Sequence, residues 1–259
     1  MEPTHDPIEW SPRPAPGPAA ERCPITPERG ATQISGATAL VTGSNRGLGR
    51  HFATQLLERG AAKVYATARR PETVDIPGAT VLRLDITDPA SIAAAREAAP
   101  DVNLLINNAG VGTAASLVTG DLDDLRHEME THFWGTLGVI RAFAPGLADG
   151  AMLNVLSALS WFALLGVTGH STAKAAEWGL TNNVRVELAG QKTQVTALHL
   201  GTVDTDLTAF MDGPKGDPAD AVRAGLDGLE AGRTEVLADE WTTKIKASLA
   251  GDPFMVAGW

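Results

Sequence analysis

The sequence predicts an α/β protein built on a single doubly wound parallel sheet. Six short apolar runs recur between residues 38 and 199, with amphipathic stretches of helical period between them. Strands that alternate with helices join through right-handed crossovers into a parallel sheet. The runs are continuously apolar rather than alternating, as in strands buried on both faces. At 259 residues, the chain is long enough for one sizeable core of this kind.

The elements follow one another in a regular order. The expected strands are, along the chain, Thr38–Val41, Lys63–Thr67, Thr80–Asp85, Leu104–Asn107, Met152–Leu156 and Thr193–His199. The expected helices between them include Gly49–Arg59, Ser91–Ala98, Leu122–Ala144 and His170–Gly190. No internal repeat interrupts this order, which favours a single domain.

The first 35 residues have a different composition. Eight of the 16 prolines lie among the first thirty residues, a bias that favours an extended, flexible arm. We therefore divide the chain into a Pro-rich arm, 1–35, and a nucleotide-binding domain, 36–259. The arm fits two interpretations: a mobile tail, or a segment that carries Ile8 and Trp10 onto a neighbouring subunit or over the active site.

Composition narrows the choice of partners and compartment. The net charge of −10 argues against a nucleic-acid groove or an anionic membrane surface. Cys23 is the single cysteine, so no internal disulfide forms, which fits a reducing cytoplasm. No apolar run approaches the roughly 18 residues of a membrane span. We expect a cytoplasmic protein with a small-molecule substrate, no nucleic-acid or membrane partner, and no metal site.

A glycine-rich turn follows the first predicted strand and opens the first helix. It reads Thr42-Gly43-Ser44-Asn45-Arg46-Gly47-Leu48-Gly49. Glycines allow a tight turn and close approach of the backbone to a pyrophosphate, and the helix N-terminus offers unpaired N–H groups. This position between strand and helix predicts a dinucleotide site.

The second strand ends at a pair of arginines rather than at a carboxylate. A carboxylate there accepts a hydrogen bond from the ribose 2′-hydroxyl of NAD, whereas an arginine suits the 2′-phosphate of NADP. Arg69 occupies this position, and Arg46 is available from the glycine turn. Two guanidinium groups can bind the phosphate through several charge-assisted hydrogen bonds. The sequence therefore favours NADP as cofactor.

From residue 36 onward the chain resembles the short-chain dehydrogenase/reductase family, whose fold is Rossmann-type. The resemblance rests on the glycine turn, on single residues after later strands, and on two short motifs: Asp85, Asn107-Asn108-Ala109-Gly110, Ser157, Lys174 and Gly201-Thr202-Val203-Asp204-Thr205. It implies that Asp85 contacts the adenine, and that Asn108, with Ala109 and Gly110, supports sheet and cofactor. It also implies that Thr205 touches the carboxamide.

Two positions of the family's Asn-Ser-Tyr-Lys tetrad are histidine in this chain. The resemblance gives Ser157 the role of holding the substrate oxygen and Lys174 that of binding the nicotinamide ribose. The tyrosine position is His170, one helical turn before Lys174, so the two side chains share a face. The asparagine position is His132. The chain's single tyrosine, Tyr65, lies elsewhere.

This exchange changes the proton chemistry. A nearby ammonium disfavours the charged form of imidazole, so we expect His170 to be largely neutral near pH 7. Neutral imidazole is a good base but a poor source of a whole proton. Ketone reduction is then slow unless the pH falls or the substrate brings its own positive charge.

Three functions remain open at this point. The first is an NADPH-dependent reductase of a carbonyl or of an imine or iminium carbon. The second is a non-redox isomerase, cyclase or dehydratase in which His170 and His132 move protons. The third is a nucleotide-binding protein without catalysis. Retention of the whole cofactor motif favours the first.

Aromatic residues and the family resemblance suggest how the rest of the site is built. Trp134, Trp161, Phe162 and Phe210 are candidates for an apolar substrate pocket, and residues 207–216 have the composition of a mobile lid. The resemblance implies a homodimer or homotetramer formed through the helices that begin near His132 and His170. The apolar segment 253–259 is a candidate docking element.

Overall fold

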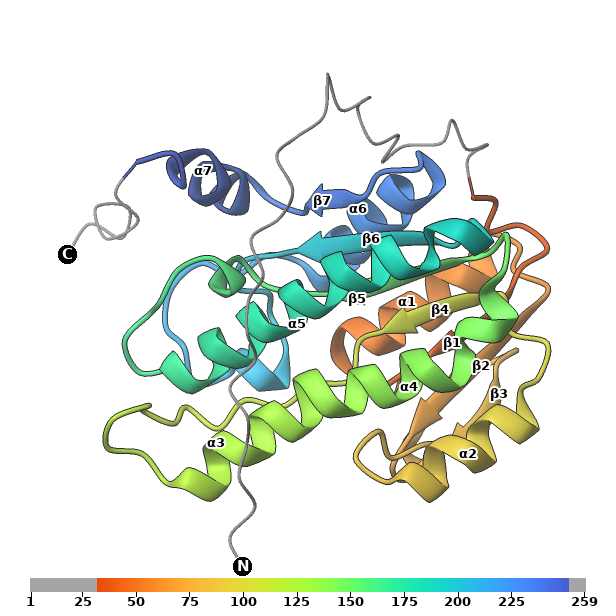
Figure 1. The fold of residues 1–259 in the computed structure, drawn as a ribbon, viewed down its shortest axis with the longest axis horizontal. Coiled ribbons are helices and arrows are strands. Elements are labelled where there is room, and N and C mark those ends of the chain that lie inside the picture. Colours follow the sequence, from red (N-terminus) through yellow and green to blue (C-terminus); the bar gives the residue numbers. More distant parts are fainter. Residues whose placement is uncertain (1–31, 252–259) are drawn as a thin grey trace, which may run out of the picture.

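The computed structural model describes residues 32–251 and contains one seven-stranded parallel sheet (Figure 1). The strand order is β3-β2-β1-β4-β5-β6-β7, so the order reverses between β1 and β4. The strands are β1 (Thr38–Val41), β2 (Lys63–Ala68), β3 (Thr80–Arg83), β4 (Leu104–Asn107), β5 (Ala151–Val155), β6 (Gln194–His199) and β7 (Glu235–Leu237). This arrangement confirms the predicted doubly wound α/β fold.

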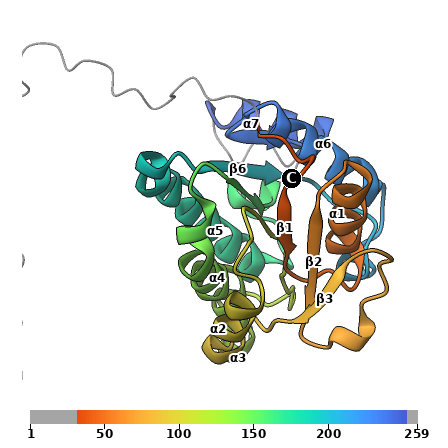
Figure 2. The ribbon, with the colours of Figure 1, turned by 90° about the vertical axis from the view of Figure 1, so that its right-hand side faces the viewer.

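Helices cover both faces of the sheet, and Figure 2 shows the two layers from the side. The helices are α1 (Gly47–Glu58), α2 (Pro89–Ala98), α3 (Leu122–Met129), α4 (Thr136–Phe143), α5 (Thr168–Glu187), α6 (Pro218–Glu230) and α7 (Glu240–Ser248). Helices α1 and α6 pack on one face, and α2, α4 and α5 pack on the other. Each face buries its own apolar cluster, with Phe52 central to the first and Phe143 to the second. The site is therefore supported by two packed layers.

The predicted strands all form, and the predicted elements differ from the observed ones at their ends and in one helix. The third strand stops at Arg83, two residues before its predicted end. The helix expected over 122–144 is interrupted by a π-helical turn at Glu130–Gly135. The Thr131 hydroxyl donates to the His127 carbonyl there, which competes with the backbone pattern of an α-helix. Such turns often occur at functional sites.

Strand β7 and the helices on either side of it were not among the elements expected from the sequence. Strand β7 has only three residues, too few for a periodic signal. Asp217 and Asp239 begin α6 and α7 by accepting hydrogen bonds from Ala219 and Thr242 backbone N–H groups. Strand β7 pairs in parallel with β6 and so extends the sheet at that edge.

The chain joins the domain before the predicted boundary at residue 36. Ile34 is fully buried in the core, and the Thr32 hydroxyl donates to Gln194. The expected flexible arm up to residue 31 and the apolar segment 253–259 lie outside the described residues. Within the described part of the chain, none of the helices combines the length and apolar character that crossing a membrane requires.

Candidate active site

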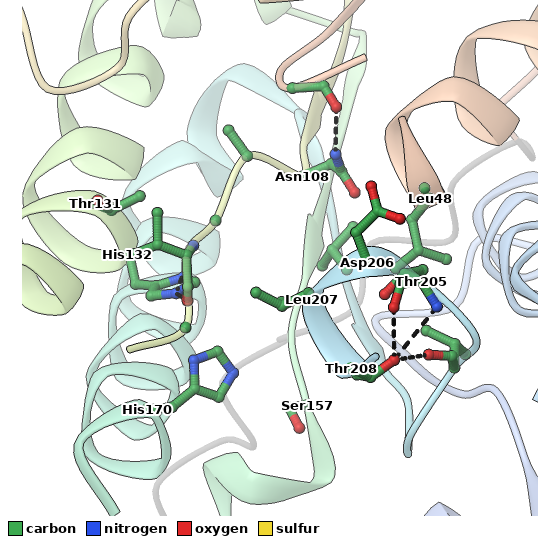
Figure 3. Close-up of a pocket in the computed structure, with 18 of the residues that line it drawn as sticks. Leu48, Asn108, Thr131, His132, Ser157, His170, Thr205, Asp206, Leu207 and Thr208 are labelled. Atoms are coloured by element: carbon green, nitrogen blue, oxygen red, sulfur yellow. Dashed lines mark hydrogen bonds between the residues drawn. The ribbon is translucent and has the colours of Figure 1, made fainter. Parts of the chain in front are cut away.

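A cavity of about 540 Å³ opens at the carboxyl ends of the parallel strands. Its lining comes mainly from the segments that follow β1, β2, β3, β4, β5 and β6, with further residues from α3, the π-helical turn, the N-terminal part of α5, and α7. The cavity spans the point between β1 and β4 where the strand order reverses. In open α/β sheets this crevice is where ligands bind. Figure 3 shows that the histidines of α5 and of the π-helical turn lie across the cavity from the 205–208 turn.

The glycine turn forms one wall of this cavity, and two of its glycines are required by backbone conformation and the third by a close contact. Gly43 has φ +70° and Gly47 has φ +52°, conformations that L side chains rarely adopt. A Cβ at Gly49 would lie 2.1 Å from the Gly43 carbonyl oxygen. Gly49 therefore packs α1 against the turn instead of lining the cavity, whereas Gly43, Asn45, Arg46, Gly47 and Leu48 line it.

The N-terminus of α1 is left available for an anion. Helices α2, α3, α6 and α7 each begin with an aspartate that caps backbone N–H groups, but α1 has no side-chain cap. Its first N–H groups therefore keep their hydrogen-bonding capacity at the cavity wall. A pyrophosphate suits this arrangement.

Asn108 ties the end of β4 to the glycine turn. Its side-chain amide donates to the carbonyls of Thr42 (2.9 Å) and Gly43 (3.2 Å). The Thr42 hydroxyl in turn accepts the backbone N–H groups of Asn108 and Ala109, both at 2.9 Å. Ala109 and Gly110 line the cavity beside it. These bonds hold two strand ends in fixed register across the crevice.

Arginines and one carboxylate line the end of the cavity nearest β2 and β3. Arg69 follows β2, and Asp85 follows β3. Burial alone would raise the pKa of Asp85, but hydrogen bonds from Thr87, with Arg69 and Arg83, hold it below the ordinary value. Arg46 forms an exposed ion pair with Asp206 at 2.9 Å. This pair joins the glycine turn to the 206–208 turn.

Thr205 and the 206–208 turn form the wall opposite the histidines (Figure 3). The Thr208 hydroxyl donates to the Val203 carbonyl, and Thr205 and Thr208 form a reciprocal cap. A Cβ on Gly47 would lie 3.4 Å from the Thr205 methyl group, so this wall also touches the glycine turn. Gly216, the last residue of the expected lid, pairs with Val203, which lies four residues before the lid begins.

His170 and Lys174 lie one turn apart on α5 and both line the cavity. Burial, together with the charges of His132 and Lys174, lowers the pKa of His170 to about 3, although the Val111 carbonyl opposes this shift. His170 is thus neutral near pH 7, as its neighbours lead one to expect. Lys174 Nζ donates to the Val155 carbonyl at 2.8 Å and to Glu177 at 2.7 Å.

His132 lies on the π-helical turn with both ring nitrogens facing oxygen atoms. Its Nε2 is 2.8 Å from the Val111 carbonyl, and its Nδ1 is 3.5 Å from a Glu177 carboxylate oxygen. The ring is 1% exposed and meets the His170 ring edge-on, with centroids 5.0 Å apart. The fold therefore brings His132, His170 and Lys174 into one cluster.

Ser157 follows β5 and reaches the same cavity (Figure 3). Its hydroxyl oxygen accepts the Leu159 backbone N–H at 3.1 Å, which leaves its proton able to point toward a substrate. Behind it, His199 Nδ1 lies 3.1 Å from the Ser157 carbonyl, and the His199 ring stacks on Trp161. Since a carbonyl only accepts, Nδ1 carries the proton in this tautomer.

Of the four aromatic residues expected in the substrate pocket, Phe210 alone lines the cavity. The other three expected residues do not line it, and each has another neighbour. Trp134 is 55% exposed and packs on Phe133, Trp161 stacks on His199, and Phe162 packs edge-on against Trp241. Other apolar residues of the lining include Leu159, Leu164, Val167, Leu207, Met211 and Trp241.

Glu177 is the main residue of the cluster that sequence reasoning missed. It lies three residues after Lys174 on α5, is 2% exposed, and contacts both Lys174 and His132. A signal was present, because a carboxylate three positions from Lys174 on the same helix lies on the same face. Trp241 gave no such signal, since it reaches the cavity from α7.

The comparisons with known proteins agree with this geometry. A family model described as "short chain dehydrogenase" matches residues 37–214, which is more than half of the chain. The chain belongs to the short-chain dehydrogenase family. This membership agrees with the resemblance that the order of its motifs carries.

Relatives within the short-chain dehydrogenase family have various substrates. The chain is 33% identical over 182 residues to an NADPH-dependent 1-acyldihydroxyacetone phosphate reductase of Schizosaccharomyces pombe, covering 65% of this chain and 60% of that protein. It is 26% identical over 238 residues to a 1-deoxy-11-beta-hydroxypentalenate dehydrogenase of Streptomyces avermitilis, covering 85% and 83%. The chain spans 60 to 66% of the length of the first curated relatives.

A solved member of the family has the same fold over most of this chain. A short chain dehydrogenase from Burkholderia cenocepacia, in complex with NADP, is 38% identical with a TM-score of 0.84. The similarity covers 88% of this chain and 98% of that protein. A second structure, a short chain dehydrogenase/reductase from Burkholderia phymatum in complex with NAD, is 21% identical with a TM-score of 0.73, covering 84% and 93%. At that identity it supports the fold alone.

Proposed function

We propose that this protein is an NADPH-dependent reductase that transfers hydride to a carbonyl or an imine or iminium carbon of a fairly apolar small molecule. The observation that carries the proposal is the position of His170. It lies in the cavity one turn before Lys174, and burial with neighbouring positive charge lowers its pKa to about 3. An electrophile that is already protonated suits such a site best.

The cavity fits a dinucleotide, and its arginines favour NADP. Gly43 allows close backbone approach, since a Cβ there would lie 3.0 Å from the Ala109 Cα. Arg69 and Arg46 both line the cavity, and the residue that follows Ala68 is arginine where NAD sites use a carboxylate. The NADP complex of the similar Burkholderia cenocepacia protein supports the same choice. When bound, NADPH supplies the hydride.

The other residues of the site have separate roles in binding the substrate and the cofactor. Ser157 donates a hydrogen bond to a substrate oxygen, and Lys174 binds the nicotinamide ribose. His170 and His132 take the positions of the family's tyrosine and asparagine, and Thr205 faces the carboxamide. Asp85 contacts the adenine. Neutral His170 accepts or donates one hydrogen bond without supplying a net proton.

An iminium carbon matches this arrangement because it needs no acid at a developing oxyanion. A ketone requires one proton on its oxygen for each hydride transferred, and neutral imidazole provides it poorly. The apolar lining near Phe210 and Leu164 favours a substrate with substantial apolar surface. As in the family, we propose a homodimer or homotetramer in the cytoplasm.

The test is NADPH oxidation against matched pairs of cyclic imines and cyclic ketones of equal ring size. We expect faster turnover of the imine, and ketone turnover that rises as the pH falls from about 8 to 5, toward the pKa of His170. Tight NADPH binding without oxidation of any member of the panel would contradict the proposal.

Restoring a phenol tests the role of His170 directly. His170→Tyr should raise ketone reduction at pH 7 about 10-fold or more, since a positioned acid contributes at least that much. The matched control is His51→Tyr, on α1 and outside the cavity lining. An unchanged ketone rate in His170→Tyr, with NADPH binding retained, would show that His170 does not stand where the acid is needed.

A further inference from the structure

A carboxylate lies directly behind the cavity, in contact with two of the proposed site residues. Glu177 Oε2 is 2.7 Å from Lys174 Nζ and 3.5 Å from His132 Nδ1. Its side chain is 2% exposed and does not line the cavity. Burying a carboxylate is costly unless charges and hydrogen bonds compensate it. The cluster supplies that compensation.

The charged groups that contact Glu177 come from α5 and from the π-helical turn. Lys174 faces it from α5, and His132 faces it from the π-helical turn. The β5 strand contributes the Val155 carbonyl, which accepts a second N–H of Lys174. Burial would raise the pKa of Glu177, but Lys174 and His132 together hold it below its ordinary value. The carboxylate is therefore ionised near pH 7.

The same two neighbours, Lys174 and His132, act on His170. Both oppose its protonation, and the Val111 carbonyl, which is 2.8 Å from His132 Nε2, favours it. Among the described residues, Glu177 is the carboxylate in ion-pair contact with both Lys174 and His132. Its negative charge thus lies against both groups that oppose protonation of His170.

We propose that Glu177 is a positioning residue that controls proton donation by His170, an inference that rests on the proposed function. It fixes two N–H groups of Lys174, together with Val155, and leaves the third for the cavity. It also holds the His132 ring edge-on to His170 by facing Nδ1. Without it, Lys174 and His132 lose the carboxylate that both contact.

The distinguishing prediction is a split between two substrate classes. Glu177→Gln keeps the size of the side chain and removes its charge, which disfavours protonated His170 by about one pH unit. Ketone reduction, which needs that proton, should fall about 10-fold at each pH from 5 to 8. Iminium reduction, which does not need it, should stay within about twofold. A purely structural role would lower both rates together.

Two variants complete the experiment. Glu177→Asp retains the charge and should recover part of the ketone rate. Glu187→Gln removes an exposed carboxylate at the end of the same helix and should behave as wild type. Equal losses on both substrates in Glu177→Gln, or no loss on either, would overturn the inference.

A spectroscopic measurement separates this inference from the proposed function. In ¹⁵N NMR of the histidine rings, the His132 resonances should shift in Glu177→Gln and stay unchanged in Glu187→Gln. The reason is that Nδ1 loses the carboxylate it faces. If the wild type oxidises no NADPH, the proposed function fails, but the spectrum still tests the contact between Glu177 and His132. His132 resonances that do not shift in Glu177→Gln would overturn the role of Glu177.

Discussion

Replacing Gly49 with alanine tests whether the glycine turn is held by packing against α1. The new Cβ would lie 2.1 Å from the Gly43 carbonyl oxygen and 2.5 Å from the Asn108 side-chain nitrogen. Real Cβ contacts essentially never fall below 3.0 Å, so backbone must move by about 1 Å. Overpacking of this kind costs about 3 kcal/mol. For a chain of this length, that lowers Tm by about 6 to 12 °C.

The movement also disturbs the wall of the cavity. The Gly43 carbonyl accepts from Asn108, so displacing it loosens the link between β1 and β4. We expect Gly49→Ala to weaken NADPH binding about 10-fold or more, because backbone misplacement removes several aligned N–H donors together. Calorimetry measures Tm, and fluorescence titration measures Kd.

The matched control is Gly179→Ala, in the middle of α5. A Cβ at Gly179 meets no atom within 4 Å, so the substitution only improves helix propensity. Its Tm should rise by about 1 to 4 °C, with Kd unchanged. If Gly49→Ala melts within about 2 °C of wild type and binds NADPH equally well, the packing argument is refuted.

Two further perturbations probe cofactor choice and acid stability. Arg69→Asp should weaken NADPH far more than NADH, by about 10-fold or more, while the charge-matched Arg50→Asp, outside the cavity lining, leaves the preference unchanged. An unaltered ratio of the two Kd values in Arg69→Asp would remove the assignment of the 2′-phosphate. Burial lowers the pKa of His199 to about 4 in the folded protein, from 6.5 in the unfolded chain. Between these two pH values the unfolded chain binds a proton at His199 and the folded protein does not. Stability should therefore fall by up to about 1.4 kcal/mol per pH unit as the pH drops from 6.5 to 4, and His199→Phe should lose that part of the slope in urea titrations; parallel curves for the two proteins would contradict it.

The sequence predicted those parts of the site that depend on local chain geometry. A glycine turn between a strand and a helix, and polar residues just after later strands, must meet at one edge of a parallel sheet. Gly43, Asn108, Ser157 and Thr205 therefore line one cavity although they are far apart in the chain. The spacing of His170 and Lys174 likewise placed both on one face of α5.

Side-chain partners across elements were less predictable. Trp161 and Phe162 follow Ser157 closely, yet each is drawn away by a ring from another element, His199 on β6 and Trp241 on α7. The sequence alone does not show which aromatic rings pack against one another. The reason is that such contacts depend on how distant helices pack, which no local periodicity encodes.

By itself, the sequence determined six strands of the sheet, the cofactor turn and the presence of two histidines in the cavity lining. Only the tertiary structure decided how those histidines behave. The π-helical turn aims His132 at Glu177, and burial of the cluster sets the charge balance around His170. Proton affinity in such a site follows from desolvation and from distances between charges, and both exist only once separate elements pack together.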